Sequence, residues 1–129
     1  MALRGVRGAI TVKGNRPAEI ISATKKLLKK IVTVNGLKTE NIASVIFSTT
    51  PDLNAEFPAL AARQLGWLYT PLLCTHEMKV AGSLKKCIRV LIHVNTLKSQ
   101  RKIKNIYLKG ARLLRPDLAD SRKDIYYQS

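Results

Sequence analysis

Four arginines stand near the ends of expected strands or helices, where a folded chain can present them to a ligand. They are Arg7, Arg63, Arg89 and Arg115. A guanidinium group is permanently charged and binds a carboxylate or phosphate through two parallel hydrogen bonds. Each arginine alone is equally well explained by a surface ion pair of little energetic value. Together they suggest a site for carboxylates or phosphate, although periodicity does not show whether they meet in space.

Arg89 has the most unusual setting, because it lies inside an apolar run that is typical of a strand, Cys87–Val94. Alternate residues of a strand point to opposite faces. One face of this strand is uniformly apolar and predicts a core contact. The other face is mixed, and its members are Cys87, Arg89, Leu91 and His93. Arg89 is then either a solvent-exposed side chain or part of a site held on a rigid strand, and the residues alone leave both open.

Other residue types that could do chemistry form weaker patterns. Cys74 and His76 share a strand face, but no second pair has the spacing of zinc ligands, so we expect neither a metal site nor a Cys–His nucleophile. Glu77 fits a general base or an exposed carboxylate at a strand end. The glycines of "RGVRG" lack the strand–GxGxxG–helix setting of a phosphate loop.

The elements that must position these residues follow from periodicity and from Pro and Gly punctuation. Strands are expected at 2–12, 41–50, 68–78, 84–96 and 106–114, and helices at 15–36 and 55–67. This β-α-β-α-β-β-β order predicts an α+β (mixed α/β) fold, with one five-stranded mixed sheet covered by two helices. We expect residues 1–129 to form a single domain, with about 119–129 as a loosely ordered C-terminal tail.

The composition limits the class of protein. A chain of 129 residues with 46% hydrophobic and 24% charged residues can bury a core without disulfides or metal. Its two cysteines lie in apolar segments, which favours reduced thiols in a cytoplasmic protein. No secretory h-region and no apolar run of about 20 residues is present, so we expect neither secretion nor a membrane span. The net charge of +15 predicts an anionic ligand or partner.

Four blocks of the chain then carry a family resemblance. They are "RGVRGAITV", "STTPDLNAEFPALAAR", "CTHEMKVAGSLKKCIRV" and "IYLKGARLLRPDL". In order and spacing they resemble the monofunctional chorismate mutases of the AroH class, the Bacillus type, from about Leu3 to Leu118.

The resemblance implies a function and an assembly. Members of this class are isomerases that rearrange chorismate to prephenate, on the route to phenylalanine and tyrosine. The step is pericyclic and needs no nucleophile, base or cofactor. The resemblance further implies a homotrimer, in which the sheets form a pseudo-α/β-barrel and the active sites lie at the clefts between subunits.

It also implies site residues. Arg7 grips a substrate carboxylate, and Tyr107 hydrogen-bonds one. Arg89 reaches the ether oxygen of the breaking bond, while Glu77 and the backbone of Cys74 hold the ring hydroxyl. The other pocket residues that it implies are Phe57, Ala59, Arg63, Leu72, Leu73, Leu114 and Arg115. One subunit is expected to supply Arg7, Glu77, Arg89 and Tyr107, and its neighbour Phe57 and Arg63.

Two alternatives remain at this point. The net charge of +15 is also typical of a small nucleic-acid-binding domain, although aromatic residues make up only 5% of the chain and no stacking pair or recognition helix is visible. The same trimeric scaffold could instead bind another small anionic metabolite, as the imine deaminases of similar build do. The set Arg7, Glu77, Arg89 and Tyr107 argues against that second alternative.

Overall fold

A computed structural model describes residues 1–114 and 125–128 of the chain. The strands are β1 (Ala2–Thr11), β2 (Ile42–Thr49), β3 (Leu72–His76), β4 (Cys87–Thr96), β5 (Asn105–Leu108) and β6 (Ile125–Gln128). The helices are α1 (Pro17–Asn35) and α2 (Ala59–Gln64), with short 3-10 turns η1 (Thr39–Asn41), η2 (Gln100–Lys102) and η3 (Lys109–Leu114).

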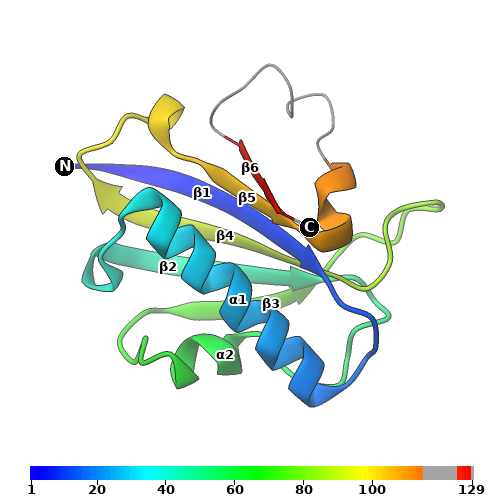
Figure 1. Cartoon of the computed structure of the whole chain (residues 1–129). Coiled ribbons are helices and arrows are strands. Elements are labelled where there is room, and N and C mark those ends of the chain that lie inside the picture. Colours follow the sequence, from blue (N-terminus) through cyan, green and yellow to red (C-terminus); the bar gives the residue numbers. More distant parts are fainter. Residues whose placement is uncertain (115–124, 129) are drawn as a thin grey trace.

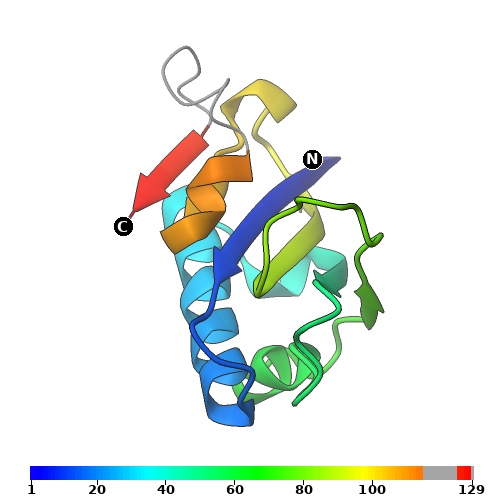
Figure 2. The ribbon, with the colours of Figure 1, turned by 90° about the vertical axis from the view of Figure 1, so that its right-hand side faces the viewer.

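The strands form one mixed sheet in the order β3-β2-β4-β1-β5-β6. β4 is antiparallel to both of its neighbours, β1 and β2, whereas the other neighbouring pairs are parallel. α1 and α2 lie on one face of this sheet (Figure 1). Figure 2 shows the loop between β3 and β4 on the side away from α1. The predicted mixed sheet with two covering helices is therefore confirmed, and within the described residues no α-helix lies on its other face.

α1 covers the sheet because its sequence has defined ends and one apolar stripe. Pro17 fits the first turn, where its missing N–H costs nothing. Gly36 ends the helix with a φ of 60°, a left-handed conformation that glycine adopts without strain. The buried stripe is Ile20, Thr24, Leu27, Leu28, Ile31 and Asn35. Positions that recur at spacings of three and four residues share one face of a helix, so this stripe can face the sheet.

β4 confirms the alternation expected of its sequence. Ile88 and Val90 are buried in the main core, as are Ile92 and Val94, and they pack with the apolar stripe of α1. The opposite face is more accessible, and Arg89 on it is exposed. Because β4 has a paired strand on each side, its backbone is fixed along most of its length. Arg89 is therefore a charged side chain on a central strand.

Some boundaries differ from the predictions. The third strand is limited to 72–76 and the second helix to 59–64. The expected fifth strand ends at Leu108, because Lys109 has a φ of 57° and the chain turns into η3. β6 adds a short sixth strand beside β5, in a segment expected to be a tail. The rest of that predicted tail lies outside the described residues.

The close packing of α1 on β1 gives a prediction about Gly8. A Cβ atom at this position would lie 2.7 Å from Ile31 Cδ1 and 3.1 Å from Leu27 Cδ1, whereas one at Gly5 would meet only Leu91 Cδ1 at 3.8 Å. We expect Gly8→Ala to lower the free energy of unfolding by about 1–3 kcal/mol through overpacking. Gly5→Ala is the matched control, with a change within about 0.5 kcal/mol. Urea unfolding at one protein concentration measures both, and equal changes would contradict the close approach.

Candidate active site

The open face of the sheet carries a cavity of about 250 Å³. Its lining comes from β1, β2, β4, β5 and the chain segments just beyond β3 and in η3. The lining residues are Arg7, Gly8, Ala9, Ile46, Ser48, Glu77, Arg89, Val90, Leu91, Tyr107 and Leu114. Five of the residues predicted for the site, Arg7, Glu77, Arg89, Tyr107 and Leu114, are thus brought together within one chain.

Strand register explains why the two arginines share this cavity. Arg7 of β1 is opposite Leu91 of β4, and Ala9 is opposite Arg89. Cross-strand partners project from the same face of a sheet. Arg7 and Arg89 therefore lie on the open face, on adjacent strands and two residue pairs apart. Ser48 of β2 flanks Arg89 from the other side.

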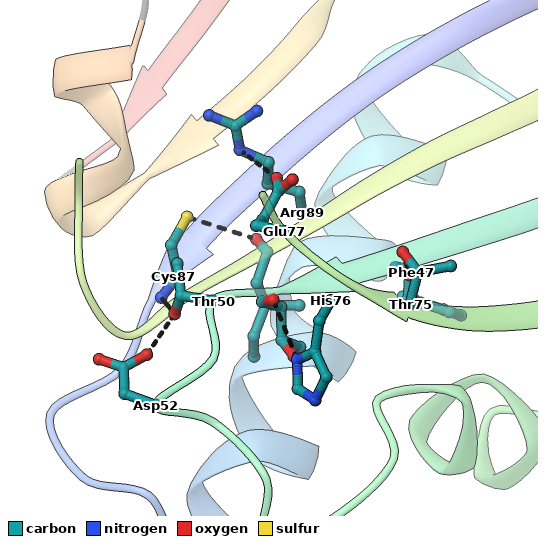
Figure 3. A network of polar contacts seen from close by, with 10 residues as sticks. Phe47, Thr50, Asp52, Thr75, His76, Glu77, Cys87 and Arg89 are labelled. Atoms are coloured by element: carbon teal, nitrogen blue, oxygen red, sulfur yellow. Dashed lines mark hydrogen bonds and ion pairs between the residues drawn. The ribbon is translucent and has the colours of Figure 1, made fainter. Parts of the chain in front are cut away.

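Glu77 and Arg89 form the main ion pair of the site. Arg89 Nε lies 3.0 Å from Glu77 Oε1, and the side chains are 48% and 26% exposed, respectively. At that exposure the pair contributes little to stability. Its effect is on orientation, because the carboxylate lies against Nε and the two terminal nitrogens point away from Glu77 (Figure 3).

Tyr107 and Leu114 close the cavity on the β5 side. Tyr107 lies beside Ala9 in the parallel pair β1–β5 and is only 4% exposed. It packs with Ala9, Cys87 and Ala111 in a second small apolar cluster, against which Leu114 also lies. This cluster places η3 over the open face. The aromatic ring of Tyr107 is thereby fixed next to the cations.

Cys87 belongs to this second apolar cluster and is a poor nucleophile. Burial raises the pKa of its thiol from 9.0 to about 11, because the thiolate loses hydration; Arg89 opposes the shift, while Glu77 and Asp52 add to it. A thiol with such a pKa carries almost no reactive thiolate at neutral pH. The cavity therefore offers fixed cations, a carboxylate and a phenol rather than an activated sulfur.

The two histidines take part in contacts between strands. His76 Nδ1 is 3.1 Å from the Thr49 hydroxyl, and His93 Nδ1 is 3.0 Å from the Ser44 hydroxyl. Within residues 1–114 and 125–128, no group of three His, Cys, Asp or Glu side chains could hold a metal ion. In the same part of the chain, no helix is long and apolar enough to cross a membrane.

The remaining predicted site residues lie apart from the first cavity. Phe57 and Cys74 line a second cavity of about 390 Å³ at the β3 edge. Arg63 is exposed on α2, whereas Ala59 is buried in the core. Leu72 is half-buried and Leu73 exposed on β3. Arg115 lies outside the described residues.

Sequence reasoning missed six residues that line the first cavity, namely Gly8, Ala9, Ile46, Ser48, Val90 and Leu91. Ala9 and Leu91 could have been found, because each shares a strand face with an arginine that was predicted. Ile46 and Ser48 could not, since their position depends on the register between β2 and β4. They supply the apolar and hydroxyl parts of the wall.

Comparisons with known proteins match this arrangement. The family model "Chorismate mutase type I" matches residues 3–118. The chain is 48% identical over 120 residues to chorismate mutase AroH of Bacillus subtilis (strain 168), covering 92% of this chain and 94% of that protein. It is 46% identical over 121 residues to chorismate mutase AroH of Thermus thermophilus, covering 93% and 99%.

A solved structure agrees as well. The chorismate mutase from Clostridium thermocellum superposes with a TM-score of 0.84 at 51% sequence identity, covering 84% of this chain and 97% of that one. The family match over nearly the whole chain, the identity to the two relatives and the shared fold all lead to one conclusion. The chain belongs to the type I chorismate mutase family.

Proposed function

We propose that this chorismate mutase, an isomerase of aromatic amino acid biosynthesis, converts chorismate to prephenate in the cavity that contains Arg7, Glu77, Arg89 and Tyr107. The observation that carries this proposal is the position of Arg89, a cation on a central strand whose fork faces a cavity of small-metabolite size. The substrate is a dianion, and the cavity has a second arginine, Arg7, on the neighbouring strand.

The chemistry asks two things of the protein. It must hold a flexible dianion in its compact reactive conformer, which is catalysis by orientation. It must also stabilise the negative charge that develops on the ether oxygen as the C–O bond breaks. Arg7 and Tyr107 serve the first need by binding a carboxylate. Arg89 serves the second, because a preorganised cation stabilises developing charge without having to reorganise at the moment of reaction.

Glu77 has a separate role in this proposal. Its backbone N–H donates to the Thr49 carbonyl at 2.8 Å, which fixes the residue at the edge of the cavity. Its Oε1 atom is buried and lies 3.0 Å from Arg89 Nε as an ion pair, without the angle of a hydrogen bond, which leaves Oε1 able to accept one from a ligand. The carboxylate then accepts a hydrogen bond from the ring hydroxyl of the substrate. The pericyclic step requires no proton transfer, so Glu77 orients groups and does not act as a base.

The site is completed by a second subunit in a homotrimer. Phe57 and Arg63 are exposed and lie outside the first cavity of their own chain, as is required of residues that serve a neighbour. Several large apolar side chains are exposed, and a monomer would leave them in water: Leu3, Phe57, Leu68, Tyr69, Leu73, Met78 and Val80. Leu72 and the backbone of Cys74, on the edge strand β3, belong to the same contact region. We place the enzyme in the cytoplasm and propose no cofactor, since the reaction has a single substrate.

The role of Arg89 predicts the effect of Arg89→Lys. A lysine keeps the charge but has no fork, so it cannot hold Glu77 and the ether oxygen together. We expect kcat to fall at least a hundred- to a thousandfold, the equivalent of roughly 3–4 kcal/mol of transition-state stabilisation. The measurement is the loss of the diene absorbance of chorismate, with circular dichroism to confirm folding. Arg101→Lys, an exposed position in η2, is the control, and turnover near wild type for both variants would exclude Arg89 from catalysis.

The proposed assembly predicts the mass in solution. Sedimentation equilibrium should give three times the mass of the 14.4 kDa chain. Mixing Arg89→Lys with Arg63→Ala subunits should restore activity above that of either variant alone, because mixed trimers contain clefts with neither substitution. A stable monomer with full activity would refute the shared site.

The two cysteines are expected to differ in reactivity toward an alkylating reagent, and substitution of Cys74 is expected to have a small effect on turnover. Cys74→Ala should change kcat less than about threefold, because only the backbone at this position is proposed to contact substrate. With a pKa of about 11, Cys87 should resist iodoacetamide at pH 7.5, while the half-buried Cys74 reacts first. Peptide mass spectrometry reports which cysteine is labelled. Loss of all activity in folded Cys74→Ala would instead indicate thiol chemistry.

A further inference from the structure

We infer that Thr50 and Asp52 are positioning residues for Arg89, acting through the backbone at the start of β4. The inference deepens the proposed function and depends on Arg89 being catalytic. Neither residue lines the cavity. Both belong to the turn after β2, and we refer to Thr50 and Asp52 together as the 50–52 clamp.

The outer contact of the clamp is the Asp52 carboxylate on Lys86. The Lys86 backbone N–H lies 2.9 Å from Asp52 Oδ2 and 3.2 Å from Oδ1. Lys86 has a φ of 50°, a conformation that residues other than glycine adopt only when their surroundings enforce it. Its carbonyl also accepts from Val12 N at 2.9 Å. Asp52 is therefore one of the groups that enforce the turn into β4.

The inner contact is the hydroxyl of Thr50, which is only 8% exposed. It donates to Asp52 Oδ1 and accepts the Cys87 backbone N–H at 3.0 Å (Figure 3). The Thr50 backbone N–H donates in turn to the Cys87 carbonyl, also at 3.0 Å. Asp52 thus orients the Thr50 hydroxyl so that its lone pair faces Cys87. Removing the Thr50 side chain leaves the buried Cys87 N–H without its acceptor, which is costly. Removing Asp52 leaves the Lys86 N–H, at an exposed position, to be hydrated and frees the Thr50 hydroxyl to turn away from Cys87.

The clamp acts close to the reacting groups. Arg89 follows Cys87 by two residues, and the ladder between β2 and β4 ends at Thr49 and Ile88, so the clamp extends this ladder by one step. The neighbouring Thr49 carbonyl accepts the Glu77 N–H at 2.8 Å. One turn therefore fixes both ends of the chain between Glu77 and Lys86. One end carries Glu77, and the other leads into β4 three residues before Arg89. The turn therefore holds the backbone at or near both partners of the 3.0 Å ion pair.

We expect the 50–52 clamp to act on Arg89 by fixing the backbone geometry at the start of β4, more than through the negative charge of Asp52. Asp52 Oδ1 alone contacts both donors, the Thr50 hydroxyl and the Lys86 N–H. An asparagine at this position keeps that oxygen but loses the negative charge, and it replaces Oδ2, the nearer acceptor of the Lys86 N–H at 2.9 Å, with an amide nitrogen that does not accept. Asp52→Asn should therefore keep the contact to Thr50 and the longer contact to Lys86, whereas Asp52→Ala removes both acceptor oxygens. This pair of variants separates positioning from electrostatics.

The experiment measures kcat and KM for Asp52→Ala, Asp52→Asn and Thr50→Val. We expect a loss in kcat on the order of tenfold for Asp52→Ala and Thr50→Val, below the hundredfold that a misplacement of 1 Å can cost. KM should change less than about threefold, because Arg7 and Tyr107 still bind substrate. Asp52→Asn, which keeps the acceptor for Thr50, should lie between wild type and Asp52→Ala. Glu40→Ala, an exposed carboxylate in η1 at the other end of β2, is the matched control for loss of one charge.

A double-mutant cycle with Arg89→Lys distinguishes positioning from general loss of structure. If the clamp acts through Arg89, Asp52→Ala should lower kcat less than about twofold in the Arg89→Lys background. An equal tenfold loss in both backgrounds would overturn the inference. So would wild-type kcat in both Asp52→Ala and Thr50→Val.

A readout without substrate keeps this test separate from the proposed function. Amide hydrogen exchange at Lys86, Cys87 and Arg89 should accelerate about tenfold or more in Asp52→Ala relative to wild type, while Val94 in the same strand stays protected. If wild type does not convert chorismate, the proposed function fails and exchange alone decides on the clamp. Unchanged exchange at these three amides would overturn the inference.

Discussion

The placement of a permanent cation on a central strand is the constraint on which the rest of this structure depends. A charged side chain there must face away from the core, and strand alternation allows this only if every second residue of β4 is apolar. Helices on both faces would bury Arg89 without adequate hydration. The sheet accordingly carries α1 and α2 on one face and leaves the other for the cavity.

Tight packing on the helix-covered face of the sheet fixes the direction of side chains on the open face. Ile88 and Val90 are held in the main core by α1, and Arg89 stands between them in the chain. The pleat of the strand therefore transmits tight packing on one side to the direction of the guanidinium on the other. The ion pair with Glu77 then selects which nitrogens remain for a ligand. A pair this exposed adds little stability, so its value is orientation.

The positive charge of the chain is compatible with the same chemistry. A dianionic substrate is attracted by a surface with a net charge of +15, and focused fields of this kind raise association rates. The few carboxylates near the site are used for position. Glu77 holds the side chain of Arg89, and Asp52 contacts the backbone where β4 begins.

Most of the architecture could be predicted from the sequence because it depends on local periodicity and on Pro and Gly signals. The apolar stripe of α1 and the two faces of β4 are examples in which a pattern along the chain alone decides which residues are buried. The end of β5 was predicted wrongly, because the turn at Lys109 depends on a positive φ in a residue that usually avoids it.

The candidate site was likewise predictable from the sequence only in part. The sequence by itself identified Arg89 as a charge on a mixed strand face, and family motifs indicated its companions. Only the tertiary structure placed Arg7, Glu77, Arg89 and Tyr107 around one cavity and added Ile46 and Ser48 to it. The physical reason is register: which residues face each other across β1, β4 and β2 is set by pairing between residues about 40 to 95 positions apart, and no local pattern encodes that pairing.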